Sequence, residues 1–146
     1  MSSLVRKKVN EAIDALEVEM LRQFKKKEAD LNHSFFKGLY VRECVMDAGM
    51  RVTSKIHRET HPYFVMQGTA EVWIDGVGWE LIVGPYYGVT LAGTRRVLRI
   101  LKKCFWITVH SNPDDGEDLE VIEERIIEKH ENKLLNNISQ QQIEGV

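Results

Sequence analysis

Apolar residues recur at helical spacing near the start of the chain. Between about Ser3 and Lys27, successive apolar side chains lie three or four residues apart, which predicts an amphipathic helix with one apolar face. The three lysines at residues 25–27 suit the negative end of the helix dipole, so this charge run requires no nucleic-acid partner. The apolar face consists of Val5, Val9, Ile13, Leu16, Met20 and Phe24.

The pattern changes between about Gly38 and His110. Short segments rich in β-branched and aromatic residues alternate with turn signals such as Asp75-Gly76 and Gly84-Pro85. Turns recur about every 8–12 residues without an intervening helical pattern, which favours an antiparallel arrangement over a parallel sheet. The pattern therefore predicts a mainly β domain of about seven or eight short strands, folded as a sandwich or barrel.

A second helical pattern follows the turn-rich residues 111–116. Acidic residues before and at its start suit a helix N-terminus, so we expect a helix that continues to about residue 134, followed by a polar tail that frays. The apolar stripe of this helix includes Leu119, Ile122, Ile126, His130 and Leu134.

Length and spacing together predict one domain made of three parts. These are an N-terminal amphipathic helix with its lead-in at residues 1–36, a β-barrel at residues 37–111, and a C-terminal helix and tail at residues 112–146. The apolar stripes of the two terminal helices must be covered, so the chain is also expected to associate with itself as a homodimer or higher oligomer.

Composition excludes several classes of partner. Lys and Arg number 20 and Asp and Glu number 22, so the net charge of −2 provides no field that would recruit nucleic acid or an anionic membrane. No apolar stretch resembles a signal peptide or a membrane span, and we expect a cytoplasmic protein. Cys44 and Cys104 are expected to be buried free thiols, with a disulfide between them as the open alternative.

Two histidines lie in a glycine-bounded block of the predicted barrel. Between Gly49 and Gly68, the chain carries Lys55, His57 and His61 at spacings of two and four. Side chains of an extended segment alternate between faces, so these three, together with Glu59, would point to one side. The cluster is a candidate site, and a solvated strand edge is the alternative.

The same block resembles the first sequence motif of the cupin superfamily, which is Gly, five residues, His-x-His, three or four residues, Glu, six residues, Gly. Both glycines and His57 carry the family residue, whereas Lys55 and His61 stand where the family has a metal-binding histidine and a glutamate. The second motif is poorly matched, with Arg96 in place of its histidine. The resemblance implies an antiparallel jelly-roll (cupin) barrel, but not the usual metal site of three histidines and one glutamate.

Shorter runs are similar to small cupin proteins encoded by tailed bacteriophages and prophages. The resemblance implies a location in the host cytoplasm or the virion and names no reaction. The matching runs are His57-x3-His61-Pro62, Gly93-Thr-Arg-Arg96, Trp106-x2-Val-His110 and His33-x4-Gly38-x-Tyr40-x-Arg42-Glu43.

The candidate residues favour a small anionic ligand. Arginine presents a planar fork to phosphate or carboxylate, lysine a point charge, and protonated histidines would add to both. The alternative is structural: only one of Arg95 and Arg96 would face inward, paired with a carboxylate. The predicted ligand-binding residues are Lys55, His57, His61, Arg96 and His110.

A metal site is the other chemistry open to these residues. His57, His61 and His110 would supply three nitrogens to zinc or iron, leaving an open coordination position. Lys55 and Arg96 would place two positive charges beside the ion, which is costly in a dry pocket, so no cofactor is expected.

The preferred interpretation is a phage-type cupin that binds a small anionic molecule in its barrel without catalysis. One alternative is a structural or assembly component of a phage virion, in contact with other virion proteins. The second alternative is a metal-dependent cupin enzyme.

Overall fold

The protein is described by a computed structural model that covers residues 2–23, 28–74 and 76–137. The chain divides into two compact units, Ala29–Lys129 and the pair of segments Met1–Glu28 and His130–Val146. No helix in the described part of the chain is both long and apolar enough to cross a membrane.

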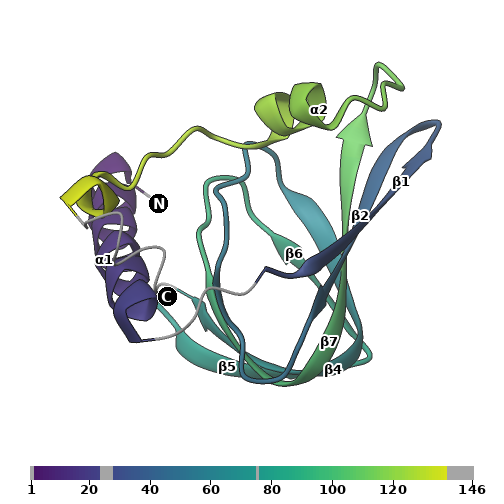
Figure 1. Ribbon diagram of the computed structural model, residues 1–146. Coiled ribbons are helices and arrows are strands. Elements are labelled where there is room, and N and C mark those ends of the chain that lie inside the picture. Colours follow the sequence, from purple (N-terminus) through teal and green to yellow (C-terminus); the bar gives the residue numbers. More distant parts are fainter. Residues whose placement is uncertain (1, 24–27, 75, 138–146) are drawn as a thin grey trace. The chain divides into compact units, whose positions relative to one another are not determined.

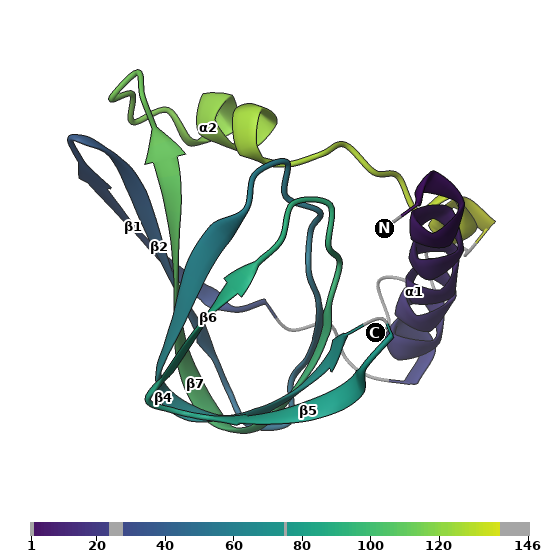
Figure 2. The ribbon, with the colours of Figure 1, turned by 180° about the vertical axis from the view of Figure 1, so that it is seen from behind.

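The larger unit is a curled sheet of seven strands in the order β1-β2-β7-β4-β5, with β3 paired to β7 and β6 paired to β4. Every pairing between these strands is antiparallel. Figures 1 and 2 show the strands curling round a common interior, which confirms the predicted jelly-roll barrel. The strands are β1 (Asp30–Phe36), β2 (Gly38–Met46), β3 (Arg51–Thr53), β4 (His61–Ile74), β5 (Gly78–Val83), β6 (Tyr86–Thr90) and β7 (Val97–Asn112).

Strands β4 and β7 are each longer than the sequence predicts. Strand β4 continues through Gly68, with shifts of register against β7 between Val65 and Ala70. Gly68 has a φ of 107°, and a Cβ there would lie 2.6 Å from the Cα of Cys104. The glycine therefore lets β4 bend closely against β7 without ending, so what resembles a turn in the sequence is a bulge.

The interior changes from apolar to polar along β7. Alternate residues of this strand are buried, as expected for one face turned inward. Cys104 and Trp106 lie in the apolar core, where the Trp106 ring stacks on Tyr63 with centroids 5.0 Å apart. The same inward row continues as Thr108 and His110, both buried. Cys44 and Cys104 are free thiols, as predicted, but only Cys104 is buried, whereas Cys44 is partly exposed.

The sheet begins earlier than the predicted barrel boundary at residue 37. Strand β1 pairs along its whole length with β2, from Asp30 opposite Val45 to Phe36 opposite Leu39. Most residues of β1 are exposed, and its sequence contains no β-branched residue. Local strand propensity is therefore weak, and pairing with β2 determines its conformation.

The C-terminal helix is shorter than predicted. Helix α2 spans Leu119–Ile126, and Asp118 caps it by accepting a hydrogen bond from the Glu120 backbone N–H at 3.1 Å. At Ile127 the chain becomes extended and forms an isolated β-bridge with His57. This tertiary pairing ends the helix, although apolar residues continue at helical spacing to residue 134.

The smaller unit consists of helix α1 (Ser3–Gln23) and a short 3-10 helix, η1 (Lys133–Asn137). The side chain of Asn132 donates to the backbone oxygen of Asp14, and His130 contacts the Asp14 carboxylate at 3.0 Å. The predicted helix is confirmed as far as Gln23. The lysines at 25–27, Phe24, Asp75 of the predicted hairpin turn and the tail from residue 138 lie outside the described residues.

Candidate functional site

Three histidines converge at one end of the barrel. A ring nitrogen from each of His57, His61 and His110 lies within 4.8 Å of the other two. Their ring centroids are 4.4 to 5.2 Å apart, and all three side chains are buried. The grouping has the size of a metal-coordination site.

The strand register explains how these residues meet. In the antiparallel pairing of β4 with β7, Tyr63 stands opposite Thr108. Two residues before Tyr63 on β4 stands His61, and two residues after Thr108 on β7 stands His110, both on the same inward face. His57 lies in the segment before β4, where its backbone oxygen accepts from the Gly93 N–H at 2.8 Å.

Burial keeps the three imidazoles neutral. Removal from water, followed by the neighbouring His61, lowers the pKa of His57 from 6.5 to about 3. The same two causes lower the pKa of His110 to about 3. Burial is also the main cause that lowers the pKa of His61. At neutral pH the cluster therefore offers nitrogen lone pairs and carries no positive charge of its own.

Hydrogen bonds orient the rings of His61 and His110, and a buried nitrogen of His57 has no partner. Nδ1 of His61 lies 3.1 Å from the carbonyl oxygen of Glu59, which can only accept, so Nδ1 is the donor and Nε2 has the lone pair. Nε2 of His110 lies 2.9 Å from Oγ1 of Thr108. Nε2 of His57 is buried and has no hydrogen-bond partner. A backbone oxygen that fixes the tautomer and an unpartnered buried nitrogen are both features of metal-binding histidines.

Lys55 does not join the histidines. Its side chain is more than half exposed, and Nζ forms an ion pair with Oε1 of Glu123 on α2 at 2.6 Å. Residues 54–56 are not part of a strand, so the alternation that would have placed Lys55 beside His57 does not apply.

Arg96 is buried and keeps unpartnered donors. Its Nη2 donates to the carbonyl oxygen of Val89 at 3.3 Å, and its guanidinium lies 5.1 Å from the centroid of the Tyr63 ring. Nε and Nη1 are buried without a hydrogen-bond partner. The charge of Arg96 is one of the causes that lower the pKa of His61, so the guanidinium lies within electrostatic range of the cluster. Arg95 is buried as well, because both arginines precede β7 and strand alternation does not separate them.

Arg42 is a functional candidate that the site prediction omitted. Its positive charge contributes to the lowered pKa of His57, His61 and His110. The residue lies on β2, two positions after Tyr40, whose ring stacks on His110 with centroids 5.7 Å apart. Strand residues two positions apart share a face, so the spacing from Tyr40 was the sequence signal that could have identified Arg42.

Solved structures with this fold include ectoine synthase from P. lautus, with a TM-score of 0.52 and 14% identity over 66% of this chain and 72% of that chain. A Klebsiella pneumoniae protein with a double-stranded beta-helix domain has a TM-score of 0.52 and 13% identity, over 68% and 84% of the two chains. KdgF from Halomonas sp. has a TM-score of 0.51 and 18% identity, over 64% and 89%. No protein-family model matches the sequence, and no curated protein matches it.

At these identities the likeness is one of fold. The larger unit has a double-stranded β-helix fold, which is the fold that the sequence resemblance implied. The histidine cluster differs from the cupin metal set implied by that motif. Only His57 occupies a motif position that carries histidine in the family, whereas His61 replaces the glutamate and His110 lies outside the first motif.

Proposed function

We propose that this chain is a metal-binding cupin that holds a zinc or iron ion on His57, His61 and His110. The observation that carries the proposal is the approach of three neutral, buried imidazoles whose ring nitrogens lie within 4.8 Å of one another. Three protein ligands leave a coordination position open, which is the arrangement of catalytic rather than structural zinc sites.

The positive charges closest to the histidines are not the pair that the sequence indicated. The charge of Lys55 is offset by Glu123, with which it forms an ion pair at 2.6 Å. Arg42 and Arg96 remain close enough to affect the histidines. A site with three neutral ligands and two nearby guanidinium groups favours an anionic ligand at the open position. The bound ion would act as a Lewis acid toward that ligand.

Arg96 supports a second candidate function, the binding of a small anion without metal. Its buried Nε and Nη1 have no partner, and a phosphate or carboxylate would satisfy both. This candidate is weaker because the histidines are held neutral and add no positive charge. A phage origin or a virion role rests on the sequence resemblance alone and adds no chemistry to either candidate.

Metal analysis of the untagged, full-length protein tests the proposal. We expect about one zinc or iron per chain, and a melting temperature that falls when a chelator removes the metal. His110→Asn should lose most of the metal, whereas His130→Asn, in the other unit, should retain it. Affinity for zinc should weaken in acid, since a proton competes for each imidazole. A protein that binds no zinc but is stabilised by phosphate, more strongly at low pH, would favour the second candidate instead.

A further inference from the structure

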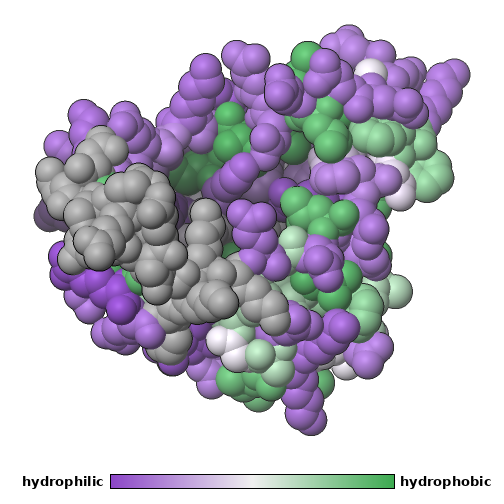
Figure 3. Space-filling view, in the orientation of Figure 1, coloured by the Kyte–Doolittle hydropathy of each residue, from purple (hydrophilic) through white to green (hydrophobic). Residues whose placement is uncertain are grey.

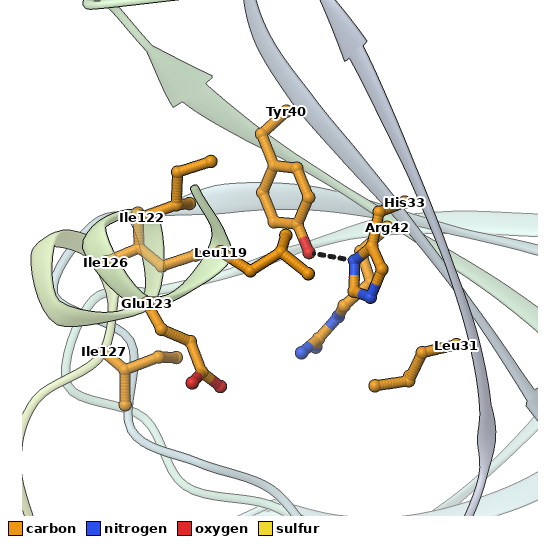
Figure 4. A pocket seen from close by; sticks show the side chains of 9 residues that line it. All are labelled: Leu31, His33, Tyr40, Arg42, Leu119, Ile122, Glu123, Ile126 and Ile127. Carbon is orange, nitrogen blue, oxygen red and sulfur yellow. Dashed lines mark hydrogen bonds between the residues drawn. The ribbon is translucent and has the colours of Figure 1, made fainter. Parts of the chain in front are cut away.

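A second candidate site lies between helix α2 and strands β1 and β2. These elements enclose a cavity of about 210 Å³ (Figure 4). Figure 3 shows hydrophobic side chains among hydrophilic ones over this part of the larger unit. The apolar walls include Leu31, Leu119, Ile122, Ile126 and Ile127, and the polar lining consists of His33, Tyr40, Arg42 and Glu123.

One charged side chain of the cavity, Arg42, has no partner of opposite charge on the cavity walls. Figure 4 shows the guanidinium of Arg42 projecting into the space. Arg42 makes no hydrogen bond or ion pair with any described residue, and its Nε is buried without a partner. The guanidinium of arginine offers only hydrogen-bond donors and carries a positive charge. A positive charge held at a cavity wall without a counter-ion favours an anionic ligand.

The other polar groups of the lining already have partners. The hydroxyl of Tyr40 and Nδ1 of His33 are hydrogen-bonded to each other at 2.6 Å. The carboxylate of Glu123 is engaged by Lys55 at 2.6 Å. Because Lys55 already offsets its charge, Glu123 offers little attraction to an ammonium group in the ligand. The lining thus favours a ligand with one negative charge near Arg42 and an otherwise apolar structure.

We propose that this cavity binds a small monocarboxylate with a short branched aliphatic chain, with the guanidinium of Arg42 as the receptor for the carboxylate. A cavity of roughly 150 Å³ accommodates benzene, so by the same ratio 210 Å³ admits about eight non-hydrogen atoms. 4-Methylpentanoate has that size, one carboxylate and a branched end that matches the isoleucine and leucine walls. The inference does not require a metal ion, because Arg42 and the apolar walls line this cavity themselves, although the charge of Arg42 also reaches the histidines.

Calorimetric titration of the full-length protein with 4-methylpentanoate tests the proposal. Arg42→Gln should weaken binding roughly tenfold or more, since it removes a charge-assisted hydrogen bond. Arg99→Gln is the matched control, because Arg99 is exposed and paired with Glu71, and it should leave the affinity unchanged. Leu119→Trp keeps Arg42 but fills the cavity, and it should also abolish binding. Should Arg42→Gln fail to fold, Leu119→Trp decides the question.

Comparison of related probes separates this site from the histidine cluster. The uncharged 4-methylpentan-1-ol and the zwitterion leucine should each bind at least about tenfold more weakly than 4-methylpentanoate. Binding should be the same with and without zinc, and Arg96→Gln should not change it. Absence of binding at millimolar concentration, or loss of binding in Arg96→Gln with retention in Arg42→Gln, would overturn the proposal while leaving the metal site untouched.

Discussion

The buried histidines predict a specific dependence of stability on pH. The pKa of His57 is about 3 in the folded protein and 6.5 in an unfolded chain, because burial disfavours the charged imidazole. The unfolded state therefore binds a proton that the folded state does not over the range between these values. Stability is fully present above about pH 6.5 and falls as the pH decreases toward 3.

The size of the effect follows from the pKa difference. Each pH unit between the two pKa values corresponds to about 1.4 kcal/mol. At pH 4.5, two units below 6.5, His57 is thus expected to reduce the free energy of unfolding by about 3 kcal/mol relative to neutral pH. Total stabilities of single domains are about 5–15 kcal/mol, so the loss is readily measured.

His57→Asn removes this titration and leaves the surrounding carboxylates in place. Urea unfolding of metal-free protein, followed by tryptophan fluorescence, gives the free energy at pH 7 and pH 4.5 for both proteins. The wild type should lose about 3 kcal/mol more than His57→Asn between these pH values. Between pH 7 and 8.5 the two pH profiles should run parallel, which serves as the internal control. Equal losses in acid would refute the argument that burial holds His57 neutral.

Three further expectations follow from the fold and the site. Gly68→Ala forces a Cβ against the backbone of β7 at a positive φ, so thermal denaturation should show a loss of several kcal/mol, and an unchanged melting temperature would contradict the bulge. Lys55→Met breaks an exposed ion pair with Glu123 and should cost less than about 1 kcal/mol in urea unfolding, whereas a larger loss would mean that the pair holds α2 in place. Light scattering of the full chain should give the mass of a dimer or higher oligomer, and a monomer would exclude self-association.

The barrel could be predicted from the sequence because the alternation of inward and outward residues in a strand is a local signal. In β7, the residues from Cys104 to His110 alternate between inward and outward positions, and the inward ones are apolar or site residues. Strand β1 was not predicted because most of its residues are exposed and none is β-branched. Its strand conformation depends on pairing with β2, which the local sequence does not show. The end of α2 at Ile126 could not be predicted from the local sequence either, because the helix ends where the next residue forms a β-bridge with His57.

The candidate site was predictable in its residues but not in its geometry. His57, His61 and His110 were identifiable from spacing and strand position, yet their approach depends on the register between β4 and β7, which no local pattern specifies. Lys55 was placed with them by an alternation that fails outside a strand. The role of Arg42 emerges only when α2 folds over β1 and β2, because the cavity walls come from separate parts of the chain.

X-ray absorption at the zinc edge of zinc-loaded, full-length protein identifies the ligands of the bound ion directly. We expect about three imidazole nitrogens at about 2.0–2.1 Å from the zinc ion, with one or two further light atoms at the open position. In the zinc that His110→Asn still retains, the imidazole count should fall by one. A spectrum without imidazole scattering, or one that His110→Asn leaves unchanged, would contradict the assignment of the three histidines as metal ligands.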